Sequence, residues 1–177
     1  MKQNRAQTLA WIDQDEGPEL NISAGEPGGS SCHGVTMQLY QEYNKFIGKA
    51  PPDLQDMRMM TSELAGVIYS RAFLDPLRFD ELPAGVDYRI ADAAITLGKT
   101  GACLIVQMTL GVYPFNGEMD DRTVAQLKII PPETTIIALS AAWLAWKHGL
   151  SADGWTKYNH GWYNRVVNVN ARAMGLI

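Results

Sequence analysis

The chain has 177 residues, of which 46% are hydrophobic and 19% charged, with a formal net charge of -4. This composition excludes an intrinsically disordered protein and allows a sizeable hydrophobic core. The acidic balance argues against a nucleic-acid-binding protein, because such proteins usually carry a basic surplus on one face. Two cysteines are too few for a disulfide framework or a structural zinc site.

Apolar residues recur at helical spacing along almost the whole chain, which predicts a mainly α-helical fold of seven or eight helices. The first helix is predicted to end near Glu16, because a Gly-Pro pair follows it. Only the stretch after Glu16 has the character of a short hairpin. Thr36 and Thr61 are predicted N-caps of the next two helices, and Gly48 ends the first of these.

The second half of the chain predicts five more helices, at 84–97, 101–110, 121–129, 132–147 and 152–173. Its longest apolar stretch, from Thr135 to Trp146, is about 12 residues, which fits a buried core helix better than a membrane span. No stable membrane insertion is therefore expected. The N-terminal segment has no apolar core of a signal peptide, so the protein is expected to accumulate in the cytoplasm.

Two carboxylates flank the loop that follows the first helix. Glu16 ends the helix, and Glu26 comes ten residues later, shortly before Ser31. The partial negative charge of a helix C-terminus opposes ionisation of a carboxyl group placed there, and an acid that keeps its proton can protonate a glycosidic oxygen. A second carboxylate with a hydroxyl can position water or stabilise an oxocarbenium-like state. The alternative is a solvated helix-end residue and an ordinary turn residue.

A metal or thiol site is the other chemistry that this loop suggests, because His33 follows Cys32. The remaining histidines, His148 and His160, lie far along the chain and flank no ligand pair. A metal site needs three or four convergent ligands, and the spacing supports none. We therefore expect neither a metal nor an organic cofactor.

Short motifs stand along the chain in a fixed order, namely Glu-Gly at 16–17, Glu-Pro-Gly-Gly at 26–29, Gly-Val-Thr at 34–36, Ile-Tyr at 68–69, Asp-Ala-Ala at 92–94 and Gly-Trp-Tyr-Asn-Arg-Val at 161–166. In order and spacing they resemble the glycoside hydrolase 108 family, which comprises muramidases found as phage endolysins and secretion-associated cell-wall enzymes. The resemblance implies a lysozyme-like fold. It also implies a catalytic part over residues 1–92 and a helical, peptidoglycan-binding part over 93–177, packed together as one compact unit.

By this resemblance Glu16 is the acid that cleaves the β-1,4 bond between N-acetylmuramic acid and N-acetylglucosamine. Glu26 and Ser31 take the places of the family's loop Asp and Thr as the other catalytic residues. The residues expected to contact the glycan are Thr36, Tyr69, Asp92 and Gln107. For the last three, a buried, hydrogen-bonded structural role is the alternative.

Four polar positions depart from the family pattern, with Glu for Asp at 26, Ser for Thr at 31, Thr for Asn at 96 and Asn for Asp at 116. Three functions remain open: a muramidase, a lytic transglycosylase that needs only the acid, and a degenerate peptidoglycan-binding or secretion-helper protein. Whether hydrolysis retains or inverts configuration depends on the carboxyl separation. The expected partner is the peptidoglycan glycan strand, bound by a monomer. A holin or a secretion device would release the protein from the host cytoplasm to the cell wall, unless it is carried in a virion.

Overall fold

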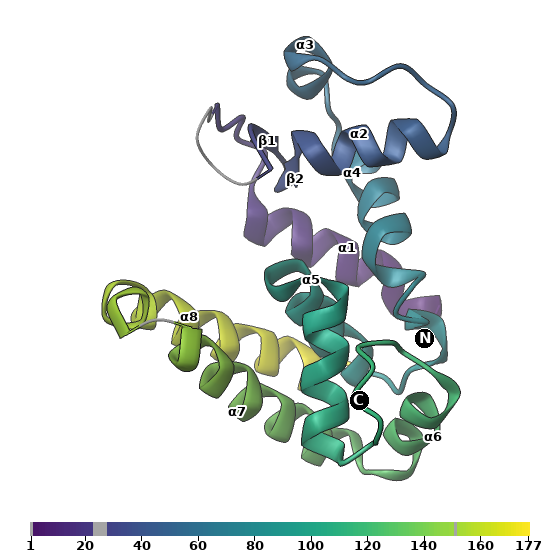
Figure 1. Ribbon diagram of the computed structural model, residues 1–177, viewed down its shortest axis with the longest axis vertical. Helices are drawn as coiled ribbons and strands as arrows, with labels where there is room; N and C mark the ends of the chain where they lie inside the picture. Colours follow the sequence, from purple (N-terminus) through teal and green to yellow (C-terminus); the bar gives the residue numbers. More distant parts are fainter. Residues whose placement is uncertain (1, 23–27, 151) are drawn as a thin grey trace. The chain divides into compact units, whose positions relative to one another are not determined.

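The computed structural model describes residues 2–22, 28–150 and 152–177. Within these residues it has eight α-helices and one two-stranded hairpin, which confirms the predicted mainly α-helical fold (Figure 1). The chain folds into two compact units, one formed by Arg5–Asp75 and the other by Met1–Asn4 together with Pro76–Ile177. The functional division expected between residues 92 and 93 stays a prediction.

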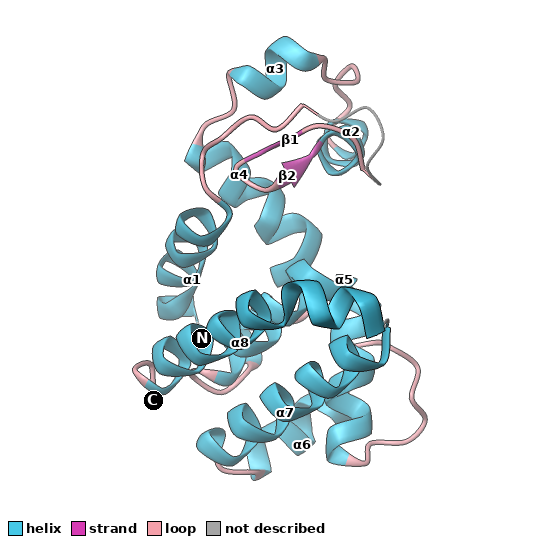
Figure 2. Cartoon of the chain, turned by 90° about the vertical axis from the view of Figure 1, so that its left-hand side faces the viewer, coloured by secondary structure: helices cyan, strands magenta, loops and turns pink. Residues whose placement is uncertain are grey.

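The unit formed by Arg5–Asp75 surrounds a small hairpin with short helices, and Figure 2 shows this hairpin next to α2 and α4. Only this region after Glu16 was expected to form strands, and the structure confirms it. Its elements are α1 (Lys2–Glu16) from Arg5 onward, β1 (Ser31–Cys32), β2 (Val35–Thr36), α2 (Met37–Phe46), α3 (Leu54–Arg58), α4 (Ser62–Tyr69) and a π-helical turn η1 (Ser70–Leu74).

Both predicted threonine caps are present. The Thr36 hydroxyl accepts a hydrogen bond from the Leu39 N–H at the start of α2, and Thr61 does the same for Leu64 at the start of α4. Helix α3 was not predicted. Its first turn is closed by a reciprocal capping box between Asp53 and Asp56, which stabilises a helix too short to show an apolar periodicity.

The other unit is a helical assembly in which α5, α7 and α8 pack against one another. Gly98 has φ 75° and ψ 162° and interrupts α5, so the two helices predicted at 84–97 and 101–110 are consecutive segments of one bent element. The predicted core helix is α7, in which Ile136, Leu139 and Trp143 are buried. The elements are a 3-10 turn η2 (Phe79–Glu81), α5 (Val86–Leu110), α6 (Asp121–Ile129), α7 (Pro132–Leu150) and α8 (Ala152–Met174).

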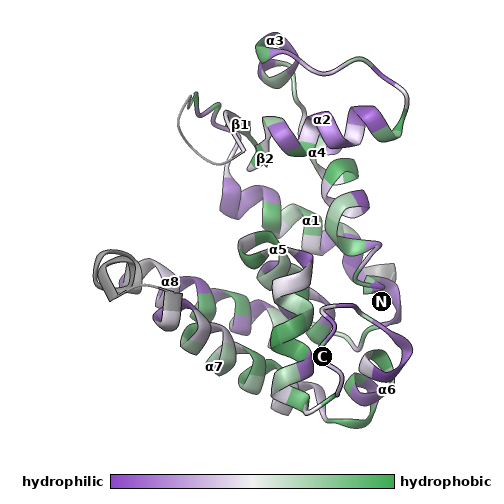
Figure 3. Ribbon diagram, in the orientation of Figure 1, coloured by the Kyte–Doolittle hydropathy of each residue, from purple (hydrophilic) through white to green (hydrophobic). Residues whose placement is uncertain are grey.

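Helix α5 is the single helix in the described ranges with the length and hydropathy of a membrane span. The sharply bent pair of α6 and α7 reaches that length and hydropathy only if the two helices are counted as one span. Figure 3 shows hydrophobic residues along much of α5. The helix also carries Asp87, Arg89 and Asp92, all buried inside the unit, and it is broken at Gly98. Buried charges with protein partners and a break of this kind are features of a core helix.

Candidate active site

Glu16 is the last residue of α1, where the sequence predicted the helix to end. Gly17 follows with φ 75°, and its N–H donates to the Asp13 carbonyl oxygen at 2.9 Å. The left-handed backbone is the reason for glycine here, because the nearest side-chain group, the Glu19 carboxylate, ends a flexible exposed side chain that can move away. This stop leaves the half-buried Glu16 side chain at the very end of the helix.

A two-residue hairpin turn lies directly against Glu16. Strands β1 and β2 pair antiparallel and leave His33 and Gly34 as the turn. Their φ angles are 49° and 69°, the combination found in a type I′ turn. A Cβ on Gly34 would lie 2.7 Å from the Cβ and Cγ of Glu16 and 2.5 Å from the Tyr69 hydroxyl oxygen. Only glycine lets the turn approach the carboxylic side chain this closely.

The turn is anchored to α1 by His33 and Asp13, whose Nδ1 and Oδ1 atoms are 2.6 Å apart. This contact is an ion pair when the imidazole is protonated. The other carboxylate oxygen of Asp13 accepts a hydrogen bond from the Ser62 hydroxyl, and the Tyr69 hydroxyl donates to the His33 carbonyl oxygen at 3.1 Å. Ser62 and Tyr69 are the first and last residues of α4, so α1 and both ends of α4 contribute to holding the turn.

The same contacts determine the ionisation of Asp13. Desolvation by burial raises the pKa of its carboxyl group, but hydrogen bonds from Ser62 and His33, together with the His33 charge, outweigh it and keep the pKa below its ordinary value. Asp13 and Ser62 were not predicted from the sequence, and His33 was given no role, because these contacts join residues 20 and 49 positions apart. The one local signal is the three-residue spacing of Asp13 and Glu16, which places both on one side of a helix.

Ser31 and Thr36 are direct partners across the hairpin. Such partners project from the same face of a β-ribbon, so their two hydroxyl groups share a face. The Thr36 hydroxyl accepts from the Leu39 N–H at 3.2 Å, and Ser31 exchanges backbone hydrogen bonds of 2.8 and 2.9 Å with Asn21. Glu26, the second predicted carboxylate, lies outside the described residues.

The other three residues expected to contact a glycan are buried: the exposed fraction is 3% for Tyr69, 3% for Asp92 and 0% for Gln107. Asp92 pairs with Arg89 at 2.9 Å and with Arg165 at 2.7 Å, in the unit that contains Pro76–Ile177. In the same unit, the nitrogen and the oxygen of the Gln107 carboxamide are both bound by the loop before α6. These contacts favour the structural alternative, and a role in glycan binding stays a prediction.

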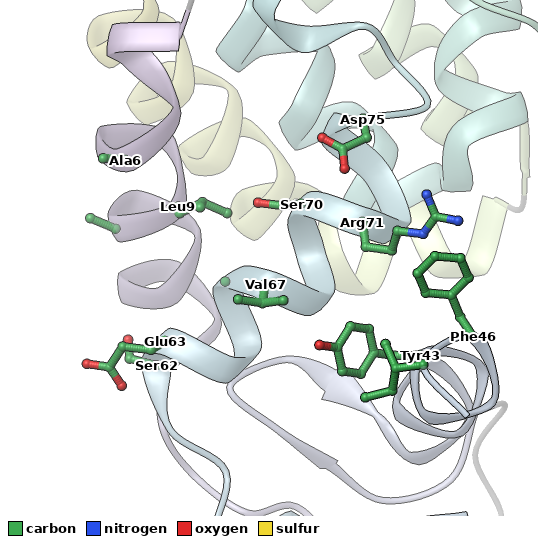
Figure 4. Close-up of a pocket in the computed structure, with 13 residues that line it drawn as sticks. Ala6, Leu9, Tyr43, Phe46, Ser62, Glu63, Val67, Ser70, Arg71 and Asp75 are labelled. Atoms are coloured by element: carbon green, nitrogen blue, oxygen red, sulfur yellow. The ribbon is translucent and has the colours of Figure 1, made fainter. Parts of the chain in front are cut away.

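A groove of about 620 Å³ opens between α1, α2, α4 and η1 (Figure 4). Its walls are mostly apolar, with Leu9 and Val67 among them. The Arg71 guanidinium lies 3.7 Å from the centre of the Phe46 ring in this groove. Glu16 does not line the groove, and Ser62 is the lining residue that also bonds to Asp13. The groove and the surroundings of Glu16 are therefore neighbouring but different features of this unit.

In the part of the chain that the structure describes, no group of three His, Cys, Asp or Glu side chains is placed to hold a metal ion. Cys32 and Cys103 are free, buried thiols. Burial raises the pKa of Cys32 and raises that of Cys103 to about 11, so both favour the unreactive thiol form.

Comparison with known families gives the same assignment as the motifs. The sequence model described as Glycosyl hydrolase 108 matches residues 9–98, just over half of the chain. This chain belongs to the glycosyl hydrolase 108 family. The matched glycosyl hydrolase 108 region contains Glu16, the hairpin and α4, and the family implies a glycoside hydrolase.

Among solved structures, the glycosyl hydrolase 108 chain is similar to SagA from Brucella abortus. The TM-score is 0.84 at 27% sequence identity, and the match covers 99% of this chain and 97% of that chain. No protein of curated function matches the sequence. The family match ends at residue 98. It therefore gives no information about a peptidoglycan-binding role of the C-terminal region.

Proposed function

We propose that this glycosyl hydrolase 108 member is an N-acetylmuramidase, which hydrolyses the β-1,4 bond between N-acetylmuramic acid and N-acetylglucosamine with Glu16 as general acid. The observation that carries the proposal is the close approach of the His33–Gly34 turn to Glu16 at the end of α1. A general acid has to lie within hydrogen-bond reach of the oxygen that it protonates, and a rigid support favours that geometry.

In this mechanism Glu16 protonates the glycosidic oxygen while the C–O bond breaks and positive charge develops on the sugar ring. Glu26 supplies the second carboxylate, and Ser31 orients the attacking water. Carboxyl groups about 5 Å apart lead to retention of configuration, whereas a separation of about 6.5–9.5 Å leads to inversion. The anomer formed first, observed by NMR during hydrolysis, distinguishes the two outcomes.

Two of the four departures from the family pattern make hydrogen bonds inside the unit that contains Pro76–Ile177. The Thr96 hydroxyl accepts a hydrogen bond from the indole N–H of Trp143 at 3.1 Å. The Asn116 side-chain oxygen accepts one from the Gln107 amide at 2.6 Å. Both contacts lie within the packing of the unit that contains Pro76–Ile177. These two departures therefore concern packing, and the choice between the active enzyme and the degenerate binding protein rests on the departures at Glu26 and Ser31.

Digestion of purified Gram-negative sacculi, followed by mass spectrometry of the soluble products, tests this function. The proposal expects muropeptides that end in a reducing N-acetylmuramic acid. Anhydro-muramic ends would instead identify a lytic transglycosylase. Sedimentation of the protein with sacculi without any released product would identify a peptidoglycan-binding protein and contradict the proposed hydrolysis.

A further inference from the structure

The hairpin turn makes two contacts with one side of α1. His33 pairs with Asp13, and Gly34 lies against Glu16, which is three residues further along the same helix. Residues spaced by three are neighbours on a helix surface. Because the two turn residues are adjacent, the distance between the turn and Glu16 is coupled to the pairing of His33 with Asp13.

The backbone of His33 indicates that its partners hold it in place. Its φ of 49° lies in the left-handed region, which is unfavourable for a residue other than glycine. Such a conformation persists where the surroundings determine it. Its partners are Asp13 at the imidazole and Tyr69 at the carbonyl oxygen, and the His33 side chain is only 11% exposed.

We propose that Asp13 and His33 are positioning residues, whose pairing holds the hairpin turn where Glu16 can reach the glycosidic oxygen. The inference rests on the proposed role of Glu16 as the general acid. Neither residue of the pair touches the reacting atoms in this account. Ser62 supports the pair from α4, because its hydroxyl binds the carboxylate oxygen of Asp13 that His33 leaves unused.

The pair has a defined set of titratable neighbours. They are Glu16 on α1, Glu63 and Tyr69 on α4, and Cys32 on β1. Glu63 interacts electrostatically with both Asp13 and His33, but no hydrogen bond joins it to either among the described contacts. Replacing Glu63 therefore changes the local charge while leaving the pair itself intact, which makes it a matched control.

The decisive variants are Asp13→Asn, His33→Asn and the double variant. Asparagine tolerates the left-handed backbone better than most residues, so His33→Asn removes the pair with little effect on the turn. We expect each single variant to lower kcat about tenfold with KM changed less than about twofold, since proton transfer suffers more than binding. The double variant is expected to be no slower than the slower single variant, because each of the three variants lacks the charged pair of Asp13 and His33.

Unchanged kcat in both single variants, or losses that multiply in the double variant, would overturn the proposal. A purely structural role would lower the unfolding temperature while kcat per folded molecule stayed constant. Glu63→Gln is expected to keep the wild-type kcat. Glu16→Gln is measured in parallel: if it is as fast as the wild type, the proposed function fails, whatever the pair does.

NMR of the same variants provides a readout that needs no activity. Loss of the pair is expected to move the amide resonance of Gly34 and the side-chain carbon resonances of Glu16, in Asp13→Asn and His33→Asn alike. Glu63→Gln is expected to leave the Gly34 resonance in place. If neither pair variant alters these two signals, the pair does not control the surroundings of Glu16 and the inference is wrong.

Discussion

Gly34 is the residue on which the geometry around Glu16 depends most directly. It combines a left-handed backbone with contacts on two sides, from Glu16 on α1 and from Tyr69 on α4. The sequence showed Gly34 as part of a Gly-Val-Thr motif, but the reason for the glycine appears only when α1, the hairpin and α4 are seen together. A motif can thus identify a required residue before its contacts are known.

Replacing Gly34 with alanine is expected to cost about 3 kcal/mol of unfolding free energy, from about 1 kcal/mol of backbone strain and about 2 kcal/mol of overpacking. Urea denaturation measures this loss. Gly48→Ala is the matched control, because Gly48 has a similar φ of 72° but nothing within 4 Å of a built Cβ. The control is expected to lose about 1 kcal/mol. Equal losses in the two variants would show that the contacts with Glu16 and Tyr69 cost nothing.

The helices show which elements local sequence can specify. The end of α1 at Glu16 and the threonine caps of α2 and α4 were predicted because a stop signal or a cap acts within a few residues. Helix α3 was not predicted, because its five residues form little more than one turn and show no apolar periodicity. The pairing of His33 with Asp13 was not predicted either, because it forms only when the hairpin folds back onto α1.

Helix α6 offers a test of capping at the scale of one element. The Asp120 carboxylate accepts hydrogen bonds from the N–H and the hydroxyl of Thr123, at 2.9 and 2.7 Å. The Thr123 N–H hydrogen bond, the Arg122 guanidinium and the Thr123 hydroxyl keep the pKa of Asp120 well below its ordinary value. We expect Asp120→Ala to lose about 1 kcal/mol of stability at pH 7, measured by urea denaturation.

The contribution of Asp120 also has a predictable pH dependence. Because its pKa is lower in the folded state, the charge-dependent stabilisation is complete above the ordinary value of about 3.9 and is lost as the pH falls through the folded pKa. The difference in stability between the wild type and Asp120→Ala is therefore expected to shrink below about pH 4. A difference that stays constant from pH 7 to pH 2 would rule out the charged cap.

At the scale of the whole molecule, the sequence predicted the mainly helical fold and most of the helices, but not α3, the continuity of α5 across Gly98 or the buried polar contacts that join the helices. Asp92 was expected to contact the glycan. In the structure it lies between Arg89, three residues away, and Arg165, 73 residues away. The distant partner cannot be inferred from local spacing. Local spacing therefore does not distinguish a carboxylate that contacts the glycan from one that joins two helices.

The net charge of -4 leads to a prediction about binding to the cell wall. A mildly acidic protein gains little long-range attraction to an acidic polymer, so binding should rest on short-range contacts with the sugars. We expect the initial rate of sacculus digestion to change less than about threefold between 50 and 200 mM salt, a range over which surface charges become strongly screened. A steep fall in rate with added salt would show that cationic attraction dominates instead.

The central claim is that Glu16 supplies the proton. The most direct measurement is the initial rate of muropeptide release from purified sacculi by Glu16→Gln relative to the wild type, with Asp15→Asn as the control on the neighbouring, exposed position. Glutamine keeps the size of the side chain but has no acidic proton, so the rate is expected to fall by about 10²–10⁴-fold while the control stays near the wild type. Equal rates for Glu16→Gln and the wild type would contradict the account.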